Sequence, residues 1–195
     1  MKPLPELRLT IVLGLLILAM GHVAEAHGQA FTELDVAGGP VAVVSSGDLA
    51  SWWTPSPGAT VSADTDFYGL RLATGLRFVR WRADRRVPDF DALTAWAGVS
   101  RQLVELGPVQ ARASGRIGNT RMAFDDRSEP GIRNESEFLA GLGLAVTYTV
   151  GPRLAVELEW AAERAYTARE VDLHLLHVSV RRSLEMPSWM RDILR

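Results

Sequence analysis

The chain has 195 residues, of which 47% are hydrophobic and 23% charged, with 21 basic and 23 acidic side chains and a formal net charge of -2. This balance provides no basic field for nucleic acid, and the apolar fraction is too high for a disordered chain. The chain has no cysteine, which excludes disulfides, cysteine zinc ligands, a thiol nucleophile and a lipidated cysteine. One domain is expected from this length.

Residues 1–26 have the pattern of a secretory signal peptide. Leu9–Met20 is almost entirely apolar, and Ala24-Glu25-Ala26 has the small-x-small order of a cleavage site. A membrane-spanning helix needs about 20 apolar residues, so this shorter stretch favours cleavage over an uncleaved anchor. We therefore expect export, with cleavage after Ala26 or Ala30 and residues 27–184 forming the folded domain.

Beyond the signal, apolar residues recur at every second position, which is the period of a β-strand. The three clearest stretches are Phe67–Ala83, Glu137–Val150 and Arg153–Glu163, and weaker ones are Asp91–Leu106, Val109–Phe124 and Val171–Leu184. In the last of these, a β-bulge near Leu175 and Leu176 would bring two apolar sets to one face. The facing of Asp91–Leu106 stays open, because neither parity is clean.

Short and long connections alternate along the chain. Gly107-Pro108 and Gly151-Pro152 predict tight turns, whereas residues 84–90, 125–136 and 166–170 are polar loops. This arrangement is typical of a transmembrane β-barrel, whose short turns are periplasmic and whose loops are outside. Six strands from Phe67 to Leu184 leave two to form earlier, in Leu34–Val44 and Trp52–Ala63. We therefore predict an all-β fold: a closed, antiparallel, up-and-down transmembrane barrel of eight strands.

The alternation alone does not decide which solvent the apolar face meets. A soluble barrel would turn it inward around a lipid or hydrophobic ligand, with Leu70, Leu72, Leu142, Leu144, Leu154 and Leu158 inside. The opposite parity is rich in small residues with isolated charges, which suits a narrow, crowded lumen. We predict lipid outside and a lumen network of Arg71, Arg77, Arg112, Arg116, Glu157, Glu159, Glu163 and His174. Aromatic residues near strand ends are predicted to form interfacial girdles: Phe67, Tyr68, Trp81, Phe124, Tyr148 and Trp160.

The last three predicted strands resemble a known family. The glycine-rich run Glu137–Tyr148, the turn and acidic-aromatic run Gly151–Trp160, and Val171–His174 leading into Val178–Arg182 are similar to the closing strands of small outer-membrane β-barrels. That family includes the OmpA-type and opacity-type barrels. The resemblance implies a Gram-negative outer membrane, insertion by the barrel-assembly machinery, and contact with lipid and lipopolysaccharide.

The chain departs from this family at its end. Such barrels usually finish on an aromatic residue, whereas here the last strand gives way at Leu184 to a tail, residues 185–195. Ser188 would cap a short amphipathic helix, with Trp189 and Ile193 four residues apart. The tail could serve as an interfacial foot or as a plug for the periplasmic mouth.

His177 and Ser179 are the strongest candidates for chemistry, because outer-membrane lipid A deacylases resemble this architecture and carry a His-x-Ser pair on a late strand. That pair faces lipid and is followed by asparagine, whereas Val180 follows here. We therefore expect no catalytic residues. His174 and His177 face opposite ways unless a bulge joins them, so we predict lumen hydrogen bonds and no metal or other cofactor.

An eight-stranded barrel has an interior just wide enough for side chains. We therefore predict an envelope scaffold or an adhesion-like surface protein rather than an open pore. Residues 84–91 and 125–136 are the loops expected to meet an extracellular ligand. Two alternatives stay open, namely a soluble periplasmic barrel that binds lipid and an enzyme that modifies lipid A.

Overall fold

The computed structural model describes residues 31–84, 87–125, 134–166 and 170–193. The predicted signal peptide lies outside this part of the chain, as do residues 85–86, 126–133 and 167–169 of the predicted loops. The described strands are β1 (Glu33–Ser45), β2 (Trp53–Pro55), β3 (Gly58–Phe67), β4 (Leu70–Ala83), β5 (Phe90–Leu106), β6 (Val109–Phe124), β7 (Glu135–Gly151), β8 (Leu154–Tyr166) and β9 (Glu170–Glu185). Two short helices accompany them, the 3-10 helix η1 (Gly47–Ser51) and α2 (Ser188–Ile193).

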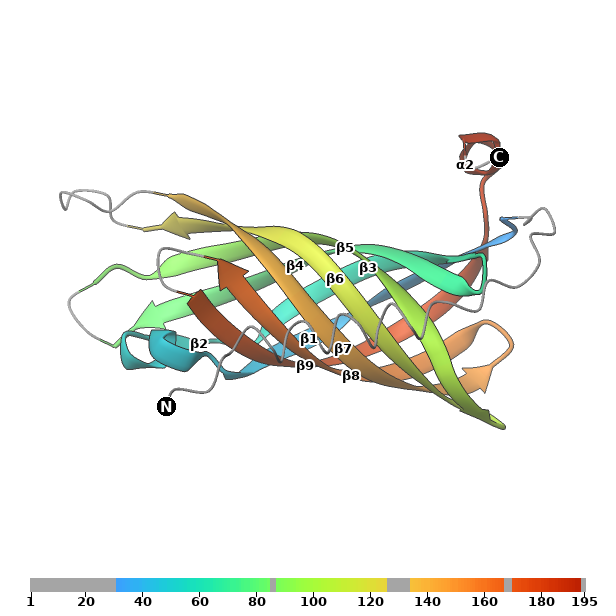
Figure 1. The fold of residues 1–195 in the computed structure, drawn as a ribbon, viewed down its shortest axis with the longest axis horizontal. Coiled ribbons are helices and arrows are strands. Elements are labelled where there is room, and N and C mark those ends of the chain that lie inside the picture. Colours follow the sequence, from blue (N-terminus) through green and yellow to red (C-terminus); the bar gives the residue numbers. More distant parts are fainter. Residues whose placement is uncertain (1–30, 85–86, 126–133, 167–169, 194–195) are drawn as a thin grey trace, which may run out of the picture.

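Eight of these strands close into a ring. Neighbours follow the order β3-β1-β9-β8-β7-β6-β5-β4, every pairing is antiparallel, and the ring closes where β4 pairs with β3 on one side and β5 on the other. Figure 1 shows the strands tilted around one elongated barrel. The predicted eight-stranded, up-and-down barrel is therefore confirmed.

The weakest predicted strand, Trp52–Ala63, is divided in the structure. β2 ends at Pro55 and β3 begins at Gly58, so Pro57 lies in the break, where its missing N–H removes no ladder hydrogen bond. Glycine suits position 58, because an added Cβ would lie 2.1 Å from the carbonyl oxygen of Phe78 on β4. β2 continues as a three-residue strand beside the loop end of β4.

Tight turns gather at one end of the barrel. Tyr68 and Gly69 join β3 to β4 with positive φ angles of 47° and 78°, so Tyr68 lies in a turn rather than within a strand that starts at Phe67. Gly107 turns with φ 59° between β5 and β6. Strands β1, β4, β6 and β8 finish at the opposite end of the barrel (Figure 1), and the connections that follow them are longer in sequence. We call these the turn end and the loop end.

The outer wall is apolar along the middle of the strands. On β7, Leu144 is 54% exposed whereas its neighbour Ala145 is 7% exposed, and β8 repeats this alternation. The exposed outward side chains include Leu76, Phe78, Leu93, Ile117, Leu142, Leu144, Val146, Leu154, Val156, Leu158, Leu176, Val178 and Val180. An apolar surface this continuous requires lipid rather than water. The soluble alternative, which needed these leucines inside, is therefore wrong.

β9 differs from its prediction. Its odd-numbered residues face inward over the whole strand, from Val171 through Leu175 to Arg181, and its pairing with β8 has no register shift. The irregularity lies in β1 instead, between Val43 and Ser45. The bulge was predicted in order to turn Val171, Leu173 and Leu175 toward lipid. These residues instead face an apolar loop end of the lumen, so no bulge is needed. On β5, the open question of facing is resolved with Trp96, Ser100 and Gln102 on the inward parity.

Among the described residues, no helix is long and apolar enough to cross a membrane.

Candidate functional site

The lumen holds a first cluster of ion pairs near the middle of the barrel. Arg77 on β4 donates two hydrogen bonds to Glu163 on β8, at 2.8 and 2.6 Å. Arg116 on β6 pairs with Glu159 and lies 3.8 Å from a Glu163 oxygen. All of these side chains are largely or fully buried, so we call Arg77, Arg116, Glu159 and Glu163 the middle cluster.

A second cluster lies toward the turn end. Arg181 on β9 contacts Asp64 on β3 and Glu157 on β8, while Arg112 on β6 pairs with the same Glu157. Arg71 on β4 completes it through Asp64, with Nε donating at 2.6 Å, and through Asp35 on β1. We call Arg71, Arg112, Arg181, Asp35, Asp64 and Glu157 the turn-end cluster.

Together the two clusters balance their charge. Each guanidinium has at least one carboxylate partner, and five arginines face five carboxylates. Burial of charges is tolerated only with such pairing, because an isolated ion in the interior costs several kcal/mol or more. Three members were absent from the predicted network: Asp35, Asp64 and Arg181. Asp35 and Asp64 lie on the first hairpin, whose register the sequence pattern left weakly defined.

His174 is not part of this network. It lies on the outward parity of β9, where its ring stacks on Trp160 of β8 at a centroid distance of 5.6 Å. The prediction placed it in the lumen because a bulge was expected. His177, which the bulge would also have placed in the lumen, does face it and is only 5% exposed.

Small inward residues make room for these large side chains. The Trp96 ring of β5 lies over its paired residue Gly75 on β4, where an added Cβ would lie 2.6 Å from the indole ring. The Arg116 guanidinium carbon lies 5.0 Å from the Trp96 ring centroid, a cation–π contact. On β7, a Cβ on Gly143 would meet Glu159 and Ser114 oxygens at 2.5 Å. The glycines on this parity are therefore required by the side chains that pack over them.

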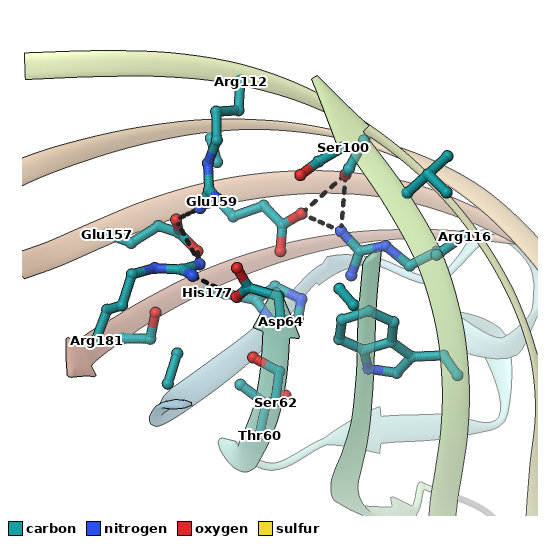
Figure 2. A pocket seen from close by; sticks show the side chains of 18 of the residues that line it. Thr60, Ser62, Asp64, Ser100, Arg112, Arg116, Glu157, Glu159, His177 and Arg181 are labelled. Atoms are coloured by element: carbon teal, nitrogen blue, oxygen red, sulfur yellow. Dashed lines mark hydrogen bonds and ion pairs between the residues drawn. The ribbon is translucent and has the colours of Figure 1, made fainter. Parts of the chain in front are cut away.

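Between the clusters a small polar cavity remains. Figure 2 shows Arg112, Glu157 and Arg181 on one side of it and Arg116 with Glu159 on the other, while His177 lies between them. Its volume is about 60 Å³, enough for only a few water molecules.

The loop end of the lumen is sealed by apolar side chains. Trp81, Phe90, Met122 and Leu175 are buried there, and the Trp81 and Phe90 rings stack at 5.6 Å. Trp53 of β2 folds over them, with its indole N–H donating to the carbonyl of Pro88 at 2.9 Å. We call this group, with Val41, Val79, Ala92 and Ala161, the apolar layer.

Two of the predicted girdle residues belong to this interior instead. Trp81 is 3% exposed, and Phe124 packs on Phe90 at a ring distance of 5.1 Å. Tyr68 and Tyr148 are exposed near the turn end, while Phe67 stacks on Phe31 beside Tyr68. Trp160 is exposed on the outer wall, in the middle of β8 rather than at its end.

The geometry required of a lipid-facing catalytic pair is not met by His177 and Ser179. Both face the lumen, where they are 5% and 7% exposed, and their outward neighbours Val178 and Val180 cover the lipid side. A lipid chain in the bilayer cannot reach them through the closed wall of paired strands.

At the loop end, Arg80 ties three segments together. Its guanidinium donates to Asp91 at 3.0 Å and to Asp125 at 2.9 Å, and pairs with Asp89 at 3.3 Å. The Arg80 hydrogen bond lowers the pKa of the Asp125 carboxyl below its usual range. The bases of both predicted outer loops are thus joined at one point.

No protein-family model matches the chain, and no curated protein matches it. Solved structures share its fold. Neisserial surface protein A is 18% identical, with a TM-score of 0.53 over 78% of this chain and 95% of that one. OprG from Pseudomonas aeruginosa is 9% identical, with a TM-score of 0.53 over 82% and 99% of the two chains. The N-terminal barrel of Pseudomonas aeruginosa OprF is also 9% identical, with a TM-score of 0.52 over 78% and 99%.

The eight-stranded ring, the apolar outer wall and this shared fold define the class of protein. The chain is a transmembrane β-barrel with the fold of the small outer-membrane barrels.

Proposed function

We propose that this barrel is an envelope scaffold that presents its outer loops for surface interaction and does not conduct solutes. The observation that carries the proposal is the filled lumen. Two charge-balanced clusters occupy its middle and turn end, the apolar layer occupies its loop end, and a space of about 60 Å³ remains between the clusters.

The ion-pair clusters and the apolar layer both oppose the passage of ions. A solute would have to separate buried ion pairs such as Arg77–Glu163, which leaves uncompensated charges in the interior. It would then meet Trp81, Phe90 and Leu175, an apolar constriction of the kind that excludes water. The barrel therefore contributes rigidity rather than a path.

The loop end supports a role in surface interaction. Loops on a rigid scaffold are where binding residues usually lie. Here Arg80 joins the base of the 84–91 loop to the base of the 125–136 loop through Asp89 and Asp125, which holds the two at a fixed separation. Two loops fixed in this way are a suitable platform for an extracellular ligand.

Conductance measurements test the proposal that the barrel does not conduct solutes. Purified protein refolded into planar lipid bilayers should show no stable ion conductance, although heat-dependent gel mobility shows that it is folded. A variant that removes both Phe90 and Trp81 side chains should conduct more than the native barrel, because it opens the apolar layer. Stable conductance of the native protein would contradict the proposal.

Attachment measurements test the proposal that the outer loops take part in surface interaction. Proteoliposomes that carry the native protein should attach to immobilised eukaryotic or bacterial cells, and attachment should be lost when residues 85–87 and 126–133 are replaced by short linkers. These replacements keep Phe90 of the apolar layer and the Arg80 partners Asp89 and Asp125. A matched control replaces the turn at Gly107-Pro108, which lies at the opposite end of the barrel. Equal attachment by the loop variant, or none by the native protein, would contradict a surface-interaction role.

We also propose that the barrel is not an enzyme. His177 and Ser179 face a closed lumen, which supports this view. Release of acyl chains from lipopolysaccharide by the native protein, abolished by Ser179→Ala, would contradict it.

A further inference from the structure

The chain remains fixed to the barrel for one residue beyond β9. The backbone N–H of Met186 donates to the carbonyl of Thr32 at 2.9 Å, and the Met186 side chain is 3% exposed. Pro187 follows, which lacks an N–H and ends the strand pairing. The tail therefore leaves the turn end of the barrel from a defined position.

Helix α2 begins directly after this point. The carbonyl of Pro187 accepts hydrogen bonds from the N–H groups of Met190 and Arg191, both at 3.1 Å. Trp189, in the first turn, is 60% exposed, and Arg191 is exposed in the last turn. A large aromatic ring and a basic side chain are thus both exposed on this helix.

The helix lies beside the barrel rather than beneath it. Figure 1 shows α2 outside the outline of the barrel wall, close to the turn end, joined to β9 by a short connection. This position does not cover the periplasmic mouth. The helix lies at the height of the tight turns, where the outer wall ends (Figure 1).

The tail emerges between an aromatic group on the β1 and β3 side, formed by Phe31, Phe67 and Tyr68, and a stretch of outer wall on β8 and β9 that lacks aromatic residues near the turn end. Near the turn end, Tyr68 faces outward at the β3–β4 turn and Tyr148 on β7. On the turn-end halves of β8, β9 and β1, the described outward residues are aliphatic, glycine, proline or charged, such as Val156, Leu184 and Val36. Interfacial aromatic girdles normally continue around a barrel. Trp189 would supply the missing aromatic ring in this sector.

Trp189 is close enough to the rim of the barrel to reach the lipid headgroups. Trp189 is three residues beyond Met186, so its Cα lies within about 11 Å of the fixed rim. The headgroup region adds about 5 to 8 Å to each side of the hydrocarbon core. Trp189 is therefore within reach of the headgroup region.

We propose that α2 is an interfacial anchor whose Trp189 ring inserts among the phospholipid headgroups of the periplasmic leaflet. The indole ring suits this layer because its body is apolar while its N–H can donate to lipid carbonyl or phosphate oxygens. Arg191 adds attraction to lipid phosphates. The anchor fixes the depth of the barrel on the β9 side.

Depth-dependent fluorescence quenching tests the proposal in the full-length protein. The protein is refolded into phosphatidylethanolamine–phosphatidylglycerol vesicles that contain lipids brominated either near the headgroup or near the chain end. The signal of Trp189 is the difference between the native protein and Trp189→Phe. Trp160→Phe provides a matched control, because Trp160 is exposed in the middle of β8.

Trp189 should lose most of its emission with the shallow bromines and little with the deep ones, whereas Trp160 should show the reverse order. Quenching of Trp189 by aqueous iodide, without an effect of either bromine, would place the helix in water and overturn the proposal. Protection from iodide and from both bromines would place it in the barrel mouth or against a protein partner, which also overturns it. Unchanged heat-dependent gel mobility of Trp189→Phe shows that the barrel is intact.

Discussion

Arg77 on β4 and Glu163 on β8 meet across the full width of the barrel, because these strands are separated by four steps in either direction around the eight-stranded ring. Two hydrogen bonds join their side chains, and both residues are at most 4% exposed. The pair therefore braces opposite walls of the lumen with one planar, bidentate contact.

Removal of one partner of the Arg77–Glu163 ion pair should lower the stability of the barrel. Glu163→Gln leaves Arg77 charged and buried, and we expect the free energy of unfolding to fall by about 3 to 5 kcal/mol. Urea unfolding of the protein in phospholipid vesicles measures this change. Arg77→Met combined with Glu163→Leu should recover much of the loss, because neither charge remains unpaired.

The exposed pair Arg153–Glu185 serves as the control for this brace. Its side chains are 68% and 85% exposed, and their atoms are 3.3 Å apart. Glu185→Gln should change stability little, since water already screens this pair. An equal effect of Glu163→Gln and Glu185→Gln would show that the buried brace has no special role.

Gly75→Ala should destabilise the barrel through Trp96. The added methyl group would lie 2.6 Å from the indole ring and 2.8 Å from the Val61 carbonyl oxygen, so strands or ring must shift, at a cost of about 1 to 3 kcal/mol. Gly151→Ala is the control, because nothing lies within 4 Å of its added methyl group. Trp96→Ala should reduce the penalty of Gly75→Ala in a double-mutant cycle, and an unchanged penalty would exclude the ring as its cause.

Leu144→Arg tests the depth of the lipid belt. Leu144 is 54% exposed in the middle of β7, and a charge at the bilayer midplane costs about 2 to 4 kcal/mol. The same substitution at Leu106, 70% exposed beside the β5–β6 turn, should cost only about 0 to 1 kcal/mol. Unfolding in vesicles measures both variants, and equal values would mean that both sites meet the same solvent.

Asp125 should remain ionised to lower pH than an ordinary aspartate. Its pKa is lowered by the hydrogen bond from Arg80, so the stabilisation is present above the unfolded pKa and is lost as pH falls through the folded one. Carboxyl-carbon NMR titration measures this pKa directly. Arg80→Gln should raise it toward the usual value, whereas Arg121→Gln, an exposed arginine on β6, should leave it unchanged.

Much of the barrel follows from the sequence because a strand has a period of two. In residues 141–150 of β7 and 154–161 of β8, apolar residues alternate with small or charged ones. The choice of which set faces lipid therefore determined the facing of Leu144 as well as Glu157. The Gly-Pro pairs indicated the tight turns. Balance between arginine and glutamate on the opposite parity predicted a charged lumen.

Only the tertiary structure showed which apolar residues near the loop end face lipid and which pack inside the barrel. Leu175, Trp81 and Phe124 are hydrophobic residues inside the barrel, where they pack against one another rather than against lipid. Residue type does not distinguish these two apolar surroundings. The expected bulge in β9 and the placement of His174 in the lumen both arose from this ambiguity.

Which charged side chains form ion pairs in the lumen likewise depends on how the ring of strands closes. Arg181 meets Asp64 across 117 positions of sequence, and Asp35 joins them from the first strand. Such contacts depend on the register and closure of all eight strands, which no local pattern contains. The sequence by itself therefore determined a membrane barrel with a polar interior, and closure of the ring determined which charges pair and where the lumen is sealed.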